Sequence, residues 1–256
     1  MAANRQAALD EFRARYIAHR GLFDNEQDHP ENTLPAFARA VEAGYGIELD
    51  VRLTKDGKLV VAHDTGLARL CDEDIAIRDL TLDELRAYHV LKSAQTIPLF
   101  SEVLDLIDGR VPLIVELKPE QDVAETCRLT DETLRSYAGT YCIECFDPRV
   151  LLWYRRHRPG VIRGQLAEDF AAGTATKSRL VNWALTAMAF NVATWPDFIA
   201  YNRAQANRFA LRFWHAVLRC TLVAWTIKAQ DELDAARRRF TVFIFDSFIP
   251  AGSPRS

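Results

Sequence analysis

The chain has 256 residues, of which 49% are hydrophobic and 26% are charged, and its formal net charge is −3. This length and composition allow one large buried core, so we expect a single domain over residues 1–256. The near balance of charges provides no basic surface for nucleic acid, and we therefore expect no nucleic-acid partner. The five cysteines are an odd number in a chain much larger than disulfide-stapled miniproteins, so we expect reduced thiols.

The amino-terminal stretch MAANRQAALDEFRAR carries charges throughout and lacks the apolar region of a signal peptide, which predicts a cytoplasmic protein. The most apolar later region, Leu180 to Trp195, is interrupted by Asn182 and Asn191. It is also too short, because a helix needs about 20 apolar residues to cross a bilayer. We therefore predict no transmembrane segment.

Short apolar runs recur along the chain with helical patterns between them. The predicted strands are Tyr16 to His19, Gly46 to Arg52, Pro112 to Glu116, Thr140 to Cys145, Val161 to Leu166, Ala187 to Asn191, Thr221 to Thr226 and Thr241 to Phe245. Alternating strands and helices predict a parallel sheet in an α/β protein. About eight such units in roughly 250 residues favour a (β/α)8 TIM-type barrel over an open sheet.

The first predicted strand ends in His19-Arg20-Gly21, where glycine allows the backbone to turn sharply. Reactive side chains in α/β proteins lie at the carboxyl ends of the strands, so His19 and Arg20 are candidate site residues. A single histidine at such a position is also common as a hydrogen-bonded structural residue.

A helix is predicted after the sequence PENT because four apolar residues have the i, i+3, i+4, i+7 spacing of one helical stripe. They are Leu34, Phe37, Ala38 and Val41. Asn32 is expected to cap the first amides of this helix, and Gly44 is expected to end it. This favours a structural cap at Asn32-Thr33 over the alternative of a catalytic pair.

Two predicted strands each contain a pair of charged residues spaced two positions apart. Glu48 and Asp50 lie on the second predicted strand, and Glu116 and Lys118 end the third. Strand alternation directs each pair to one face, where carboxylates can share a cation. The same patterns are also typical of a strand with one solvent-exposed face and of a surface ion pair.

The second strand is expected to continue into a hairpin. Asp56-Gly57 is a signal for a two-residue turn, which would pair Lys55 with Lys58 and place His63 directly across from Asp50. A three-residue loop would shift this register by one. Between His63 and Pro98 the strand and helix alternation is interrupted, and Leu80 to Tyr88 is expected to form a helix.

Five motifs in order, HRG, PENT, ELDVRLTKDG, VVAHD and ELK, resemble the glycerophosphodiester phosphodiesterase family. The resemblance is strong over the first half of the chain. It is looser in ECFDPRVL and LVAWTIK, and FIFDSFIP departs from the family's more usual threonine-aspartate ending. The resemblance implies a small insertion at about 65–97 that overhangs the active site, where Arg69 is either a substrate contact or a surface residue.

The three carboxylates Glu48, Asp50 and Glu116 form an all-oxygen set suited to one divalent cation, Mg²⁺ or Ca²⁺. The resemblance implies His19 and His63 as the general acid and base, in an order left open. Arg20 suits bidentate contact with phosphate, and Lys118 suits a compact positive charge. Trp225 is a further candidate for substrate binding, against the alternative that it fills the core.

The resemblance implies hydrolysis of a small-molecule glycerophosphodiester to glycerol 3-phosphate and an alcohol. One alternative is a phospholipase D acting on lysophospholipids, for which Phe209, Phe213 and Trp214 would form an apolar ramp in peripheral contact with lipid. Another is a binding module that has lost turnover. The sequence leaves open the oligomeric state and the choice between attack by water and a cyclic phosphate route.

Overall fold

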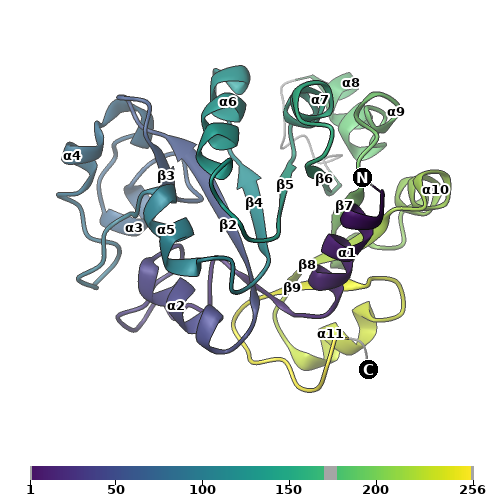
Figure 1. Cartoon of the computed structure of the whole chain (residues 1–256), viewed down its shortest axis with the longest axis horizontal. Helices are drawn as coiled ribbons and strands as arrows, with labels where there is room; N and C mark the ends of the chain where they lie inside the picture. Colours follow the sequence, from purple (N-terminus) through teal and green to yellow (C-terminus); the bar gives the residue numbers. More distant parts are fainter. Residues whose placement is uncertain (1, 170–177, 255–256) are drawn as a thin grey trace. The chain divides into compact units, whose positions relative to one another are not determined.

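The computed structural model describes residues 2–169 and 178–254 (Figure 1). The chain divides into two compact units. We call Ile17–Tyr141 the N-terminal unit, and Met1–Tyr16 together with Cys142–Ser256 the C-terminal unit. The expectation of one domain over the whole chain stays a prediction.

The N-terminal unit contains three parallel strands, β1 (Ile17–His19), β2 (Gly46–Leu53) and β4 (Leu113–Leu117), with β2 in the middle. The register pairs His19 of β1 with Glu48 of β2, and Asp50 of β2 with Glu116 of β4. The strand pairing alone therefore aligns three of the predicted acidic residues and one histidine.

Strand β2 is buried on both faces. Ile47, Leu49 and Val51 alternate with the polar residues along it and are fully buried. Glu48 and Asp50 are buried as well, so the interpretation of β2 as a strand with one solvent-exposed face is wrong. Buried carboxylates need compensating charge or hydrogen bonds, and this requirement shapes the site.

Helix α2 (Leu34–Glu42) follows β1 and contacts α5 (Phe100–Ile107), beside which it lies in Figure 1. Its buried stripe is Ala36, Phe37, Ala40 and Val41. The predicted end is confirmed, since Gly44 follows the C-cap with φ of 72°. The predicted cap is wrong. Thr33 occupies the N-cap position, and the Asn32 side chain donates instead to Asp50.

The hairpin between β2 and β3 (Leu59–Val61) has a three-residue loop, and the predicted pairing is wrong by one residue. Leu53 pairs with Leu59, and Thr54 faces Lys58, whose carbonyl accepts from the Thr54 amide at 2.9 Å. The Thr54 hydroxyl accepts from the Lys58 amide at 2.9 Å and stabilises the longer loop, where Gly57 has φ of 71°. The residue across from Asp50 is therefore Ala62, whose amide donates to the Asp50 carbonyl.

The segment after β3 has a hydrophobic cluster of its own, built from short elements. These are α3 (Ala68–Cys71), η1 (Ile77–Asp79) and α4 (Leu82–Leu85). Leu67, Ile77 and Leu85 are among its buried residues. The predicted helix Leu80 to Tyr88 is shorter than expected, and it begins with a capping box formed by Thr81 and Glu84. Helix α6 (Val123–Leu134) completes the unit.

The C-terminal unit contains five parallel strands paired in chain order, from β5 to β9. They are β5 (Tyr141–Cys145), β6 (Ile162–Ala167), β7 (Phe198–Asn202), β8 (Thr221–Ile227) and β9 (Val242–Phe245). Its helices are α1 (Ala2–Arg13), α7 (Pro148–His157), α8 (Arg179–Thr186), α9 (Asn191–Thr194), η3 (Arg203–Gln205), α10 (Phe209–Leu218) and α11 (Gln230–Ala236). The described residues thus contain eight parallel strands, three in one unit and five in the other.

Seven of the eight predicted strands are confirmed, and the prediction of a strand at Ala187 to Asn191 is wrong. That segment follows α8 and ends at the first residue of α9, and the strand is Phe198–Asn202 instead. Alanine and methionine favour helix, whereas Phe198, Ile199 and Tyr201 are aromatic or β-branched residues typical of strands.

The cysteines are free, as predicted. Cys142 and Cys145 have the spacing of a C-x-x-C pair, but both lie on β5. Residues three apart on a strand face opposite sides, so these two thiols cannot form a disulfide there. Among the residues that the structure describes, no helix has the length and apolar character to cross a bilayer.

Candidate active site

Three buried carboxylates converge on one face of the sheet in the N-terminal unit. Glu48 and Asp50 lie two apart on β2, and Glu116 lies next to Asp50 on β4. A carboxylate oxygen of Glu48 lies within 4.8 Å of one of Glu116. Glu48 and Glu116 are thus close enough to share an ion, whereas Asp50 lies beside Glu116 on the neighbouring strand and is outside that group of oxygens.

Two cationic side chains partly neutralise this set. The Lys118 ammonium lies 2.7 Å from Glu116 Oε1 and 3.2 Å from Asp50 Oδ1, and Arg20 Nε lies 3.6 Å from Asp50 Oδ2. Asn32 Nδ2 donates to Asp50 Oδ2 at 3.1 Å. The pair Asp50 and Glu116 thus accommodates a positive charge between its two carboxylates.

The environment separates the pKa values of Asp50 and Glu116. Burial raises the pKa of Asp50, but Lys118, His63 and Arg20 lower it more, so it lies well below its usual range. Burial and the charge of Asp50 raise the pKa of Glu116 to about 7, against the opposing effect of Lys118. Burial lowers the pKa of Lys118, yet Glu116 and Asp50 raise it more, and the ammonium stays charged. A further cation at this place would favour the ionised form of Glu116.

His63 has a lowered pKa and a carboxylate partner on one of its two ring nitrogens. Its Nδ1 lies 2.8 Å from Asp64 Oδ1, and Arg52 donates to the His63 carbonyl from Nε at 3.0 Å and from its second guanidinium nitrogen at 2.6 Å. Burial lowers the pKa of His63 below its ordinary value of 6.5, although Asp50 and Asp64 raise it. Because a carboxylate only accepts hydrogen bonds, Nδ1 carries the proton and Nε2 keeps its lone pair.

His19 lies next to the carboxylates on the neighbouring strand. Its Nε2 is 3.8 Å from Glu48 Oε2, a distance at which a protonated ring is stabilised by the carboxylate. The two predicted histidines therefore differ in surroundings. His19 has a carboxylate near its Nε2, whereas the carboxylate partner of His63 lies at Nδ1.

A turn with unusual backbone geometry positions Arg20. Arg20 and Asn32 have φ of 57° and 56°, and such positive values are energetically unfavourable for residues other than glycine. The Arg20 amide donates to the Glu48 carbonyl at 2.9 Å, and the Asn32 amide donates to the Arg20 carbonyl at 2.9 Å. Gly21 follows with φ of 84°. The two residues with strained backbone, Arg20 and Asn32, are thus the two whose side chains contact Asp50.

A network that the sequence interpretation did not assign connects Arg20 with His63. Glu31 Oε1 accepts from Arg20 at 2.7 Å, and both Glu31 oxygens accept from Arg69, at 2.7 and 2.8 Å. Arg69 Nε donates to Asp64 Oδ2 at 2.6 Å, and Asp64 binds His63. Burial raises the pKa of Glu31, but Arg69 and Arg20 lower it more, to about 2. Glu31 lies in the PENT motif and Asp64 in the VVAHD motif, so these two motifs are the sequence signal for the network.

Arg69 is therefore not an isolated surface arginine. It connects α3 in the 65–97 segment with the loop after β1 and with the loop that carries His63. The long guanidinium fork suits two carboxylates at once.

Two aromatic predictions concern the C-terminal unit. Trp225 lies on β8 and packs edge to face on Phe146, with ring centroids 5.7 Å apart. Its role in substrate binding stays a prediction. Trp214 is buried, and its indole donates to the Ala187 carbonyl at 2.9 Å. The prediction that Trp214 belongs to an exposed apolar ramp is therefore wrong, whereas Phe209 and Phe213 are exposed.

The model of the Glycerophosphoryl diester phosphodiesterase family matches residues 19–240 of this chain. The chain belongs to that family. The match begins at His19 and includes every residue of the site described above. The family resemblance read from the five motifs is thus confirmed.

The relatives cover the chain to different extents. A glycerophosphodiester phosphodiesterase from Bacillus altitudinis is 38% identical over 116 residues, which are 43% of this chain and 46% of the relative. A lysophospholipase D from Homo sapiens is 31% identical over 131 residues, or 46% of this chain and 40% of the relative. The chain thus matches less than half of the length of these curated relatives.

The similarity to solved structures extends over nearly the whole chain. A phosphodiesterase from Oleispira antarctica, solved in complex with the product sn-glycerol-3-phosphate, superposes with a TM-score of 0.75 at 23% identity. The superposition covers 94% of this chain and 95% of that one. This likeness and the eight parallel strands confirm the predicted (β/α)8 TIM-type barrel fold.

Proposed function

We propose that this protein hydrolyses glycerophosphodiesters to glycerol 3-phosphate and an alcohol, in a reaction that depends on a divalent metal. The observation that carries the proposal is the convergence of two histidines, three buried carboxylates, Arg20 and Lys118 within one unit. The family membership and the product bound to the Oleispira antarctica relative support the substrate class.

The chemistry of the donor set supports a hard cation. Glu48, Asp50 and Glu116 offer oxygen atoms only, which suits Mg²⁺ or Ca²⁺. The Lys118 ammonium beside Asp50 and Glu116 supports the proposal that these carboxylates attract positive charge. When bound, the ion would supply charge stabilisation for the phosphoryl oxygens. With three carboxylates, one divalent ion, Arg20, Lys118 and a phosphodiester, the site has no net charge.

Arg20 and Lys118 would bind the phosphate group. The Arg20 guanidinium offers a planar pair of donors and Lys118 a compact charge, and both lie beside Asp50, which fixes their positions. Trp225 is a further proposed substrate contact.

His63 and His19 would move the protons. The neutral His63 ring has a free lone pair on Nε2, which suits it to accept the proton of the attacking hydroxyl. His19, beside Glu48, is suited to give a proton to the leaving alkoxide. Both the attack of water and a cyclic phosphate route are compatible with this assignment.

The test is hydrolysis of a panel of glycerophosphodiesters, including glycerophosphocholine and glycerophosphoethanolamine, with chelator and then with Mg²⁺, Ca²⁺ or Mn²⁺ added back. We expect activity to disappear with the chelator and to return with at least one ion. Activity that survives complete metal removal would refute the metal dependence, and inactivity towards every diester with every ion would refute the proposed reaction.

The roles of the histidines are tested by single variants. His19→Ala and His63→Ala should each lower kcat by about 10²- to 10⁴-fold without loss of the circular dichroism spectrum. His89→Ala is the matched control, because His89 is exposed and lies outside the site. Turnover near that of the wild type in either site variant would show that the assignment is wrong.

A second candidate is a lysophospholipase D reaction, which the exposed Phe209 and Phe213 and the similarity to a lysophospholipase D favour. Both reactions cleave a phosphodiester, so the acylated and deacylated forms of one substrate separate them. Faster choline release from lysophosphatidylcholine than from glycerophosphocholine would support the second reaction. Five free thiols fit a reducing compartment, and we propose the cytoplasm as the location.

A further inference from the structure

Two helices of the C-terminal unit have inverted polarity. On α8, Leu180 and Trp183 are 73% and 64% exposed, whereas Asn182 between them is only 4% exposed. On α9, Val192 is 68% exposed and Asn191 is buried. Surface helices of globular proteins normally bury their apolar residues and expose their polar ones. These two helices do the opposite.

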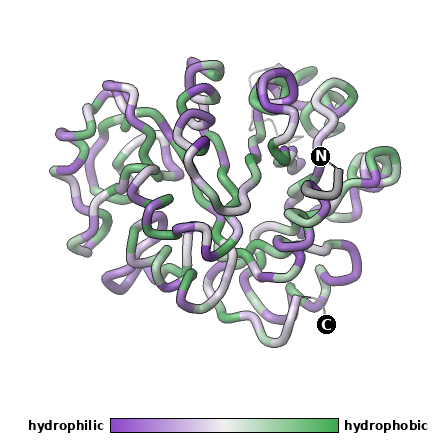
Figure 2. Tube along the Cα trace, viewed as in Figure 1, coloured by the Kyte–Doolittle hydropathy of each residue, from purple (hydrophilic) through white to green (hydrophobic). Residues whose placement is uncertain are grey.

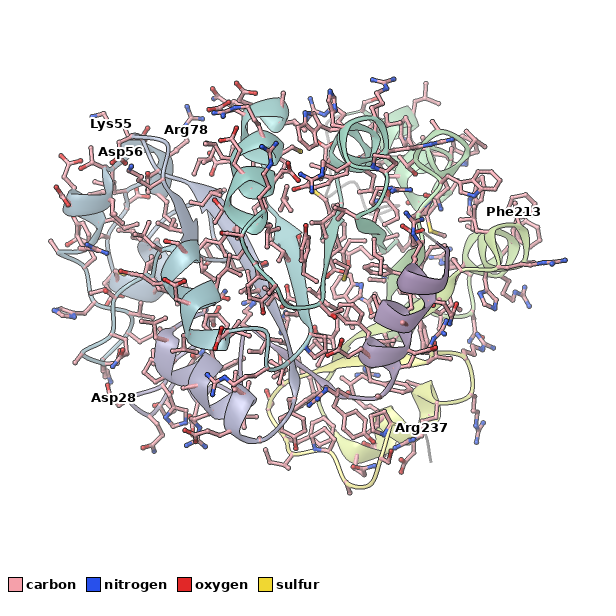
Figure 3. All side chains as sticks on the ribbon, viewed as in Figure 1. Asp28, Lys55, Asp56, Arg78, Phe213 and Arg237 are labelled. Atoms are coloured by element: carbon pink, nitrogen blue, oxygen red, sulfur yellow. The ribbon has the colours of Figure 1, made fainter. Side chains whose placement is uncertain are left out.

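Most residues of helix α10 are apolar, and its trace in Figure 2 is largely green. Some of these residues are buried and others are exposed. Leu211 and Trp214 are buried, and the Trp214 indole donates to the Ala187 carbonyl just after α8. Phe209 and Phe213 are 74% and 46% exposed. Their rings stack with centroids 6.1 Å apart and form an apolar stripe with i, i+4 spacing. Figure 3 labels Phe213 on this helix.

Positive charge accompanies this apolar surface. Between residues 178 and 230 the sequence has six basic residues and one acidic residue, although the whole chain has a formal net charge of −3. The basic residues are Arg179, Arg203, Arg208, Arg212, Arg219 and Lys228. The acidic residue, Asp197, is paired with Arg5 and Arg163.

Part of this charge is available to a partner. Arg203 and Arg208 are paired with Glu232 and Asp169. Arg179, Arg212 and Arg219 are exposed and form no ion pair with the residues that the structure describes. Exposed aromatic and aliphatic side chains bordered by unpaired arginines are typical of a helix that lies in a membrane interface.

We propose that α8, α9 and α10 form a docking surface for a bilayer that contains anionic lipid. The apolar side chains would enter the boundary between headgroups and acyl chains, and the arginines would contact the lipid phosphates. A second copy of the chain is a poorer partner, because a symmetric contact on this surface would oppose positive charge to positive charge. Docking needs no catalysis, so the inference goes beyond the proposed reaction.

The test is sedimentation of the full-length protein with vesicles of phosphatidylcholine alone or with 30% phosphatidylglycerol. We expect binding to the anionic vesicles, loss of binding at high salt, and little binding to phosphatidylcholine alone. Phe209→Ser with Phe213→Ser should weaken binding at least about tenfold, because two exposed aromatic side chains no longer enter the bilayer. Arg212→Glu should weaken it by about fivefold or more.

Matched controls lie outside the surface. Ile249 is an exposed apolar residue near the chain end and Lys92 is an exposed lysine of the N-terminal unit, so Ile249→Ser and Lys92→Glu should bind like the wild type. Hydrolysis of soluble glycerophosphocholine should be unchanged in all four variants, which separates docking from the proposed reaction. Absence of vesicle binding, equal binding by the surface variants, or a dimer in analytical ultracentrifugation that is broken by the phenylalanine variant would each overturn the proposal.

Discussion

Replacement of Glu31 by glutamine tests the buried network that connects Arg20 with the loop of His63. Glu31 is almost fully buried and accepts hydrogen bonds from two arginines, which lowers its pKa from 4.5 to about 2 against the opposing effect of burial. A folded pKa below the unfolded one means that the carboxylate stabilises the fold above pH 4.5 and that this contribution is lost as the pH falls towards 2. The difference corresponds to about 3 kcal/mol at pH 7 and to about 1.5 kcal/mol at pH 3.

The measurement is urea unfolding of the wild type and of Glu31→Gln at both pH values, followed by circular dichroism. We expect the variant to be about 3 kcal/mol less stable at pH 7, because two cationic side chains lose their shared carboxylate. The gap between the two proteins should narrow by about half at pH 3. Glu26→Gln is a matched control, since Glu26 is an exposed glutamate in the same loop.

Two results would refute this reasoning. A gap below about 0.5 kcal/mol at pH 7 would mean that the paired carboxylate does not stabilise the fold. A gap that is the same at both pH values would mean that the effect of the variant comes from packing and not from the charge of Glu31.

Three further variants address positioning and packing. Asp64→Asn should lower kcat by about 10- to 100-fold with little change in the KM for glycerophosphocholine. An asparagine that accepts from Arg69 presents its NH2 group to His63 Nδ1, so the tautomer of His63 is no longer fixed, and an unchanged kcat would contradict this role. Gly21→Ala should lower Tm measurably, because the new Cβ would lie 2.9 Å from the Ala36 carbonyl carbon at a residue with positive φ; a Tm equal to that of the wild type would show that the turn relaxes. Phe37→Ala should cost about 3 to 5 kcal/mol in urea unfolding, since this side chain is fully buried in α2, and a cost below about 1 kcal/mol would contradict that packing.

The sequence predicted most of the site because strand geometry is local. Residues two apart on a strand share a face whatever the rest of the chain does, so the spacing of Glu48 and Asp50 was sufficient to predict that their carboxylates converge. The parallel register then added Glu116 opposite Asp50. Apolar runs predicted seven of the strands for the same reason.

Features that depend on a balance between similar alternatives were missed. The hairpin register depends on the Thr54 hydroxyl, which stabilises a three-residue loop. The sequence Asp56-Gly57 is equally compatible with a two-residue turn. Asn32 is expected to cap α2 with its side-chain oxygen, but its Nδ2 donates to a buried Asp50 oxygen, which orients the side chain towards the carboxylates. Arg69 reaches Glu31 across 38 residues, a pairing that no local pattern encodes.

The ammonium of Lys118 between Asp50 and Glu116 acts as an internal counter-ion. The repulsion between these two buried carboxylates is therefore reduced by the polypeptide itself. If turnover needs a divalent ion, as proposed, the folded chain and the active enzyme become two separate quantities, because only the second would follow the supply of the ion.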